Sequence, residues 1–384
     1  MVHYLFFTIL AFVLSMICGF IVIPSILNFC YKRELYDSPE ARKVHTQAVP
    51  RLGGVAFLPS MLLAFVVSIF VVASVTGREQ VTLSLWSFMF IISLFMIYVV
   101  GIIDDVVGLG AKTKFAVQIV AATLLPISGL YINNLYGFCG ITEIPFWVGA
   151  PLTVFVIVFI DNAINLIDGI DGLAGGLALM SLLGFLVCFA REGVWSYCVL
   201  ISGLMGVLAA YLYFNLWGKA ERNRKIFMGD TGSLTLGFIL GFLVVKFAMN
   251  NTHVMPYRSD SLLLSYTLLI VPCFDVVRVI ITRLRDRQPL FKADKRHIHH
   301  KLLKCGLTQH MTLIVILCFA LFFDAINLTL YPLVPVTFIV AIDIIIYVGF
   351  HLGLDRIIKK KGGVSKLKLS EVRLRRKLKE DNGQ

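Results

Sequence analysis

Apolar residues fill most of this chain in long runs, and short polar segments separate the runs. A helix needs about 20 apolar residues to cross the hydrocarbon core of a bilayer. Runs of about this length cover 3–27, 52–76, 83–103, 115–132, 147–164, 173–190, 195–216, 232–249, 263–281, 310–329 and 334–353. The pattern predicts an all-α polytopic membrane protein with about eleven transmembrane helices.

The composition leaves little material for a soluble domain. Hydrophobic residues make up 58% of the chain, charged residues 15%, and the mean hydropathy is +0.85. A water-soluble fold of this composition would lack the polar side chains to cover its surface. We predict one integral membrane domain over 1–353, with functional cytoplasmic loops, and a basic cytoplasmic tail over 354–384.

Lysine and arginine lie almost entirely on one side of the predicted spans. If the 30–51 loop is cytoplasmic, the cytoplasmic segments and the tail together hold 30 of the 35 basic residues. Cytoplasmic loops of membrane proteins carry such an excess of positive charge. The distribution predicts an amino terminus outside the cell and a carboxyl terminus in the cytoplasm.

Five aspartates lie at the ends of apolar runs, in a chain whose formal net charge is +12. The predicted orientation brings all five to the cytoplasmic face, in the glycine-containing segments GIIDDVVGLG, NLIDGIDGLAGG and MGDTGS. A single carboxylate there would be a solvated cap, but five on one face need a compensating cation. They indicate a divalent metal that carries phosphate, and they are Asp104, Asp105, Asp168, Asp171 and Asp230.

The segment around Asp168 predicts a polar helix face that ends in a glycine-rich break. Asp161, Asn165 and Asp168 are spaced i, i+4 and i+7, so a continuous helix carries them on one face. The glycines that follow allow the backbone to approach a bulky anionic ligand. A simple glycine-rich turn formed by aspartate is the alternative.

Asp104 and Asp105 are neighbours, so on a helix their side chains project about 100° apart. They cannot both address the same atom. One is expected to face the site, while the other holds a cation, a backbone amide or a lysine such as Lys112 or Lys114. Asp230 precedes another span, where helix amides favour a phosphate beside a metal, and a plain N-cap is the alternative.

The most basic internal loop contains a dense group of histidines. The segment KADKRHIHHKLL covers residues 292–303 and suits the binding of an anion such as pyrophosphate. Zinc binding is the competing hypothesis, because His297 and His300 are spaced i, i+3. The segment lacks a cysteine pair or a carboxylate and histidine spacing to complete a zinc site, so we favour the anion.

These motifs resemble those of the polyprenyl-phosphate N-acetylhexosamine-1-phosphate transferases. The matching segments are GIIDD, NAINLIDGIDGLAGG, FMGDTGS and RHIHH, preceded by DSPEARKVHTQAVPRLGG. The pattern is most similar to the bacterial undecaprenyl-phosphate GlcNAc-1-phosphate transferase branch of glycosyltransferase family 4. The resemblance implies an enzyme of the bacterial cytoplasmic (inner) membrane that moves sugar-1-phosphate from a UDP-N-acetylhexosamine to undecaprenyl phosphate. The products would be undecaprenyl-pyrophosphoryl-sugar and UMP, the first step of a cell-surface glycan.

The resemblance also implies roles for individual residues. The group that deprotonates or positions the lipid phosphate would be Asp104 or Asp105, and support beside the metal would come from Asp168. Magnesium ligands would be Asp230 and Asn165. Nucleotide contacts would come from Asp171, Phe227, Asn215 and Lys43, with His45 as the alternative to Lys43. The pyrophosphate and sugar would be held by Arg296, His297, His299 and His300.

Departures from the family pattern bear on the donor. The muramoyl-pentapeptide branch carries a Thr-Pro-Thr-Met-Gly-Gly stretch and three adjacent histidines, whereas this chain has VPRLGG and HIHH. This difference favours a small sugar nucleotide, most simply UDP-GlcNAc, and leaves GalNAc and deoxyhexosamine donors open. The expected cofactor is Mg²⁺, with Mn²⁺ as the alternative. The expected partners are the two substrates and membrane lipid, with no nucleic acid, and a homodimer stays open.

Two other classes of membrane protein compete with this hypothesis. An ion-coupled transporter also carries intramembrane aspartates, but it predicts inverted repeats and acids near the bilayer midplane. The sequence contains no such repeat, and its acids cluster at the cytoplasmic edge. A CDP-alcohol phosphotransferase would carry more aspartates in one helical segment, followed by glycine and arginine.

Overall fold

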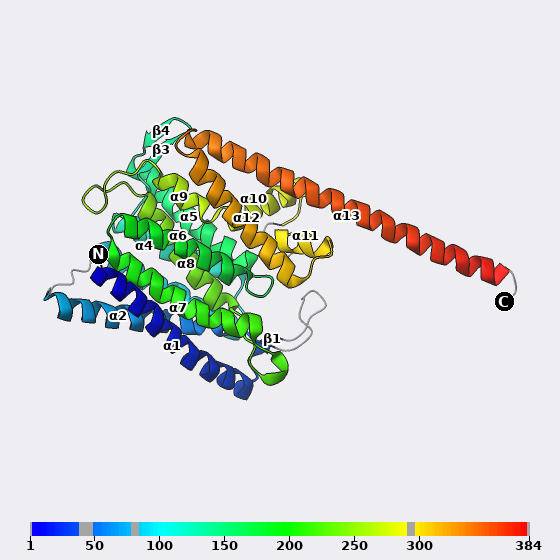
Figure 1. Ribbon diagram of the computed structural model, residues 1–384, viewed down its shortest axis with the longest axis horizontal. Helices are drawn as coiled ribbons and strands as arrows, with labels where there is room; N and C mark the ends of the chain where they lie inside the picture. The colour runs from blue at the N-terminus through cyan, green and yellow to red at the C-terminus, as the bar shows by residue number, and fades with distance from the viewer. Residues whose placement is uncertain (1, 38–48, 78–83, 290–295, 382–384) are drawn as a thin grey trace.

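The computed structural model describes residues 2–37, 49–77, 84–289 and 296–381, which form a bundle of helices (Figure 1). The helices are α1 (Val2–Arg33), α2 (Phe57–Thr76), α3 (Leu85–Val107), α4 (Ala111–Ile127), α5 (Phe146–Ile167), α6 (Leu173–Arg191), α7 (Trp195–Trp217), α8 (Gly229–Ala248), α9 (Ser261–Thr267), α10 (Ile270–Arg285), α11 (Ile298–Lys304), α12 (Gln309–Leu330) and α13 (Val336–Asp381). Short 3₁₀ turns are η1 (Gly53–Ala56) and η2 (Ala220–Arg222). Two antiparallel hairpins pair β1 (Tyr36–Asp37) with β2 (Val49–Pro50) and β3 (Asn134–Phe138) with β4 (Ile141–Glu143).

The all-α membrane architecture agrees with the sequence prediction, but the count of eleven spans is not confirmed. In the described part of the chain, nine helices are long and apolar enough to cross a membrane. A tenth span results if α9 and α10, which are bent by 70° relative to each other, are taken together. The remaining predicted span corresponds to α4, which has only 17 residues and carries two lysines in its first turn.

Helix α8 is the centre of the bundle, because every residue from Thr231 to Ala248 is buried. Its most apolar stretch is entirely buried, whereas the outer helices α12 and α13 bury only 22% of theirs. Glycines allow the close packing of α8 against α5. A Cβ atom added at Gly237 would lie 2.6 Å from the Cα atom of Asp161. The exposed apolar side chains of the outer helices, such as Phe70 and Trp147, suit contact with lipid.

The polar ends of three helices meet at one end of this bundle. Side chains at the end of α3 and the end of α5 both approach Asp230 at the start of α8. The chain must therefore return across the bundle between α3 and α5. Helix α4 makes this return, since Asn133, which follows it, donates a hydrogen bond to the carbonyl oxygen of Asn250 beyond the far end of α8.

The last helix extends well past the bundle. Helix α13 runs without interruption for 46 residues, and Figure 1 shows its final part projecting away from the other helices. The predicted basic tail from residue 354 is therefore helical as far as Asp381 and continues the last span directly.

Candidate active site

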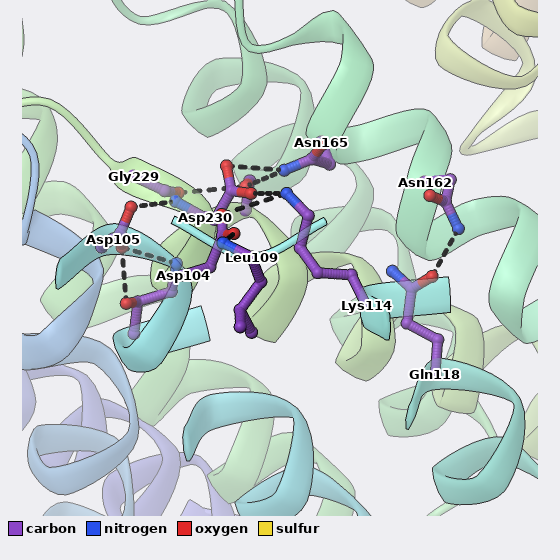
Figure 2. A network of polar contacts seen from close by, with 11 residues as sticks. Asp104, Asp105, Leu109, Lys114, Gln118, Asn162, Asn165, Gly229 and Asp230 are labelled. Atoms are coloured by element: carbon purple, nitrogen blue, oxygen red, sulfur yellow. Dashed lines mark hydrogen bonds and ion pairs between the residues drawn. The ribbon is translucent and has the colours of Figure 1, made fainter. Parts of the chain in front are cut away.

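Four helices contribute side chains to a polar cluster at the end of the bundle where α8 begins (Figure 2). Asp104 comes from α3, Lys114 from α4, Asn165 from α5 and Asp230 from α8. These residues are far apart in sequence and come from three of the predicted motifs. The structure thus brings together the catalytic and metal-binding candidates that the sequence placed on one face.

Lys114 joins the two carboxylates at the centre of the cluster. Its ammonium group donates a hydrogen bond to Oδ2 of Asp104 at 3.0 Å and also contacts Oδ2 of Asp230. Asp104 accepts a second hydrogen bond from the backbone amide of Leu109 at 2.6 Å. The side chains are largely covered, with 22% of Lys114, 11% of Asp104 and 28% of Asp230 exposed. Burial makes this cation necessary, because two adjacent carboxylates out of bulk water repel each other.

Asp105 points away from Lys114 and instead caps α8. Its Oδ1 accepts a hydrogen bond from the amide of Asp230 at 2.8 Å. Its Oδ2 accepts one from the amide of Thr231 at 2.8 Å and one from the hydroxyl of Thr231 at 2.6 Å. A carboxylate is favourable here because the amides at a helix amino terminus lack partners within the helix. The two amides that the sequence offered to a phosphate are thus occupied by Asp105.

Asn165 connects the α5 end of the cluster to α8. Its amide nitrogen donates hydrogen bonds to Oδ1 of Asp230 at 3.2 Å and to the hydroxyl of Ser233 at 2.9 Å. The hydroxyl of Ser233 in turn donates to the carbonyl oxygen of Gly229 at 3.0 Å. The predicted metal ligands Asp230 and Asn165 are therefore in direct contact.

The donor set suits magnesium better than a metal that the protein would enclose alone. In the described ranges, no three His, Cys, Asp or Glu side chains are grouped closely enough to hold a metal ion. Magnesium takes one or two protein carboxylates and completes its shell with water and substrate phosphates. Asp230 and Asp104 already converge on a single cation, the Lys114 ammonium. Asn165 could ligate through Oδ1 after its amide rotates by half a turn.

Asp168 ends α5 next to the cluster and is only partly exposed. Its environment raises its pKa to about 7, because burial disfavours the charged carboxylate and Asp230, Asp171 and Asp105 repel it. The group thus accepts a proton near neutral pH in the metal-free protein. This property suits the supporting role beside a cation that the sequence predicted for it.

The pKa of Asp168 predicts how the stability of the metal-free protein depends on pH. Because its folded-state pKa of about 7 exceeds the ordinary 3.8, the folded protein binds the proton more tightly between these values. Stability should therefore fall as pH rises through this window, by at most about 1.4 kcal/mol per pH unit. Asp168→Asn should flatten the decrease. Melting temperatures in EDTA at pH 5 and pH 8 check this, and equal slopes for variant and wild type would contradict it.

The structure describes three of the four nucleotide-binding candidates, namely Asp171, Asn215 and Phe227. Asp171 forms an ion pair with Lys225 at 2.6 Å, which links the glycine-rich segment to the loop before α8. Asn215 is buried, accepts a hydrogen bond from the amide of Gly172 at 2.7 Å and donates one to the carbonyl oxygen of Ile226 at 2.9 Å. Its polar atoms thus organise these two segments.

Phe227 lies in the same loop and is partly exposed. Its backbone amide donates to the carbonyl oxygen of Pro50 at 2.7 Å, so the segment before α8 docks on the end of the first loop. Lys43 and its alternative His45 lie outside the described residues. The predicted contact of the first loop with a nucleotide therefore stays a prediction.

The histidine motif packs against α10 and against the glycine-rich segment. Nδ1 of His297 lies 2.7 Å from Oδ2 of Asp275, and Arg278 pairs with the same carboxyl group at 2.8 Å. Asp275 and Arg278 are spaced i, i+3 on α10, a spacing that places both side chains on one face of the helix. Arg296, the next candidate, pairs with Asp286 at 2.6 Å.

His299 is the histidine that reaches the carboxylate motif. A Cβ atom added at Gly169 would lie 2.2 Å from Nε2 of His299, so the imidazole rests directly on the glycine that follows Asp168. Burial and the neighbouring His300 and His297 lower the pKa of His299 to about 3. The ring is therefore neutral at neutral pH, and it can contribute hydrogen bonds to an anion but no charge.

Two basic residues of the cluster had only a weak signal in the sequence. Lys114 was named as one of two partners for the Asp104 and Asp105 pair, but its bridge to Asp230 depends on the packing of α4 against α3 and α5. Lys225 belongs to a basic loop whose charge served only to set the predicted topology. Neither could be placed in the site without the contacts between distant segments.

The fold and the cluster define a polytopic membrane protein with a carboxylate site suited to phosphoryl transfer at one membrane face. Residues 87–248 match the model of glycosyl transferase family 4. A probable undecaprenyl-phosphate N-acetylglucosaminyl 1-phosphate transferase of Bacillus subtilis (strain 168) is 33% identical over 320 residues, covering 80% of both chains. The chain belongs to this family of polyprenyl-phosphate GlcNAc-1-phosphate transferases, as its motifs predicted.

More distant relatives agree with this assignment. An undecaprenyl-phosphate α-N-acetylglucosaminyl 1-phosphate transferase of Yersinia pestis is 28% identical over 286 residues, covering 73% of both chains. The protein of the same name from Escherichia coli (strain K12) is 26% identical over 286 residues, covering 73% of this chain and 72% of the relative. Family membership sets aside the transporter and the CDP-alcohol phosphotransferase hypotheses.

Proposed function

We propose that the protein transfers N-acetylglucosamine-1-phosphate from UDP-GlcNAc to undecaprenyl phosphate. The products are undecaprenyl-pyrophosphoryl-GlcNAc and UMP, and the reaction initiates a bacterial cell-surface glycan. The 33% identity over 80% of the chain to a relative named for this transfer carries the proposal. The convergence of Asp104, Asn165 and Asp230 on one point supports it.

The transfer exchanges one phosphoanhydride bond for another. An oxygen of the lipid phosphate attacks the phosphorus that bears the sugar, and the bond from this phosphorus to the oxygen of UMP breaks. UMP leaves with both bonding electrons. Such a step requires alignment of the two phosphates and compensation of their charge more than covalent help from the protein.

Asp104 is the residue best placed to receive the lipid phosphate. Its carboxylate faces the cluster and bonds Lys114, whereas Asp105 is committed to α8. Asp104 can accept a proton from a protonated lipid phosphate or orient the attacking oxygen. Lys114 lies beside it and can compensate the negative charge of the incoming phosphate.

Asp230 and Asn165 would hold Mg²⁺, with Mn²⁺ as the alternative ion. A bound divalent ion neutralises charge on the diphosphate of the donor and fixes its orientation. Asp168, next to these ligands, supports the site by exchanging a proton as the local charge changes. Lys114 balances Asp230 when the ion is absent.

The remaining candidates would bind the donor around this centre. Asp171, Phe227 and Lys43 are proposed to contact the nucleotide, and Asn215 positions the loops that carry the first two. The pyrophosphate and sugar are proposed to bind at the histidine motif, whose residues are Arg296, His297, His299 and His300. The contact of His299 with Gly169 supports this division, because it joins the motif to the carboxylate segment.

The site would face the cytoplasm of a bacterial inner membrane. Basic residues concentrate in the segments on the side of the cluster, which supports an outside amino terminus and a cytoplasmic carboxyl terminus. Counting α4 and the bent pair of α9 and α10 as crossings gives eleven spans, an odd number, as termini on opposite sides of the membrane require. The cytoplasmic face is also where UDP-sugars are available.

The assignment of Asp104 and Asp105 predicts opposite behaviour for their asparagine variants. Asp105→Asn disrupts the cap of α8, because asparagine offers one acceptor oxygen in place of the two that accept from the amides of Asp230 and Thr231. It should therefore lower the free energy of unfolding by about 1–3 kcal/mol. Asp104→Asn leaves this cap intact and should reduce turnover far more than it reduces stability. Melting temperature and turnover measured on both variants check the distinction. Equal melting temperatures with equal activity loss would show that the two carboxylates are not specialised.

The proposed reaction is tested with the purified protein in detergent. Undecaprenyl phosphate, magnesium and a panel of radiolabelled UDP-sugars are supplied, including UDP-GlcNAc, UDP-GalNAc and UDP-MurNAc-pentapeptide. UDP-GlcNAc should give UMP and a labelled lipid pyrophosphate, and EDTA should stop the reaction. The proposal fails if none of the donors yields these products, and a different preferred donor would correct the sugar.

A further inference from the structure

A cavity of about 410 Å³ lies between α10, α11 and α13, and of the described residues that line it only Arg296 is assigned to the transfer reaction. Its charged lining consists of Arg278, Arg285, Arg296, Lys301, Lys304 and Asp355. Among the described residues that line it, five charged side chains are basic and only Asp355 is acidic. The cavity therefore suits an anionic ligand.

Two buried polar groups at this cavity lack partners among the described residues. The side chain of His351 is 4% exposed, lines the cavity, and neither of its ring nitrogens has a hydrogen-bond partner. The Nε atom of Arg278, another lining residue, also has none. Buried donors and acceptors normally find partners, because leaving them unpaired is costly. These atoms point to a polar ligand group that would satisfy them.

The remaining wall of the cavity is apolar and faces outward. Val348 and Leu352 are one turn apart on α13 and line the cavity, yet they are 48% and 55% exposed. They belong to the stretch of α13 that is apolar enough to cross a membrane. A ligand that fits both walls has an anionic head and a hydrocarbon chain.

The cavity lies on a different face of α11 from the histidine that approaches the carboxylate site. His299 contacts Gly169, whereas Lys301 reaches across to Asp355 of α13 at 2.8 Å. Lys361 of α13 also donates a hydrogen bond to the carbonyl oxygen of Cys305, just beyond α11, at 2.5 Å. A ligand in this cavity would therefore hold α11 and α13 together on a different face of α11 from the one that carries His299.

We propose that this cavity binds the phosphate headgroup of an anionic membrane lipid from the cytoplasmic leaflet. The phosphate lies among the basic residues of α10 and α11 and satisfies His351 and Arg278, while an acyl chain follows Val348 and Leu352. Binding stabilises the packing of α11 between α10 and α13. The proposal is independent of the donor sugar and of the catalytic step.

The experiment follows the melting temperature of the full chain in detergent as phosphatidylglycerol is added, because a ligand of the folded state raises it. Phosphatidylcholine and inorganic phosphate are the comparison ligands. The test variant is the double substitution Arg285→Gln with Lys304→Gln, which removes two cavity charges. Its matched control is Lys359→Gln with Lys360→Gln, which removes two exposed charges of α13 outside the cavity lining. His351→Phe is a second variant that retains every lysine and arginine.

Phosphatidylglycerol should stabilise the wild type and the control pair, with little effect of phosphatidylcholine. The cavity pair should weaken the apparent affinity at least about tenfold, the scale of two basic groups at an anionic lipid surface. His351→Phe should weaken it as well. Equal losses in the cavity and control pairs would show nonspecific attraction and overturn the proposal. Equal stabilisation by inorganic phosphate would overturn the choice of a lipid.

Discussion

Replacing Asp230 with asparagine should reduce turnover by on the order of 10³-fold, the scale of removing one preorganised charge-stabilising group. The substitution keeps the size of the side chain but removes the charge that pairs with Lys114. It should also weaken the dependence of activity on Mg²⁺. Turnover of undecaprenyl phosphate and UDP-GlcNAc over a range of magnesium concentrations measures both effects.

A matched control separates this effect from a general loss of charge. Asp260 pairs with Arg191 at 2.9 Å beyond the carboxyl end of α6, away from the cluster. Asp260→Asn should leave turnover within about twofold of the wild type, because it removes a carboxylate at the end of the bundle opposite the cluster. The melting temperatures of Asp230→Asn and Asp260→Asn should be similar. Near-normal turnover of Asp230→Asn would remove Asp230 from the proposed metal site.

Replacing Gly54 with alanine should distort the active site by displacing the backbone of α8. A Cβ atom there would lie 2.0 Å from the amide nitrogen and 2.1 Å from the Cα atom of Gly232 in α8. Neither backbone can move without shifting the first turn of α8, which carries Asp230. We expect a loss of about 3 kcal/mol in the free energy of unfolding, the upper end of typical overpacking costs. Turnover should fall sharply as well.

The control for this substitution is Gly349→Ala in α13. A Cβ atom at Gly349 meets no atom within 4 Å among the described residues. Alanine also favours a helix over glycine, so stability should stay equal or rise by about 0.5–1 kcal/mol. Melting temperature and turnover are measured for both variants. A stable and active Gly54→Ala protein would mean that η1 and α8 can separate without disturbing Asp230.

The composition and motifs of the sequence predicted much of the architecture. Long apolar runs predicted the helices correctly because burial in lipid requires their length. The resemblance to the transferase family placed Asn165 and Asp230 together, and the structure shows that their side chains are in contact. The ion pair of Asp275 with Arg278 is local, because the i, i+3 spacing brings these side chains together on α10.

Other features depend on contacts between distant segments, which periodicity does not encode. The sequence indicated that Asp104 and Asp105 differ, but only the docking of α3 on α8 assigns Asp105 to the helix amides. The bend between α9 and α10 lies within an apolar run, so hydropathy predicted one straight span. Hydropathy also predicted a span over 115–132, and the contacts at the two ends of α4, which is short and begins with lysines, support that crossing.

The bridge made by Lys114 changes how the affinity for magnesium should be understood. Lys114 would compete with a divalent ion for the two carboxylates. Because the fold holds it beside them, its effective concentration there does not depend on the solution. A divalent ion bound at the proposed metal site would have to displace Lys114, so the dissociation constant of the ion would include the cost of breaking two ion pairs. A neutral residue at position 114 would raise the affinity for the ion while it lowers the stability of the ion-free protein. Lys114 would thus determine both the affinity of the site for the ion and the stability of the protein without the ion.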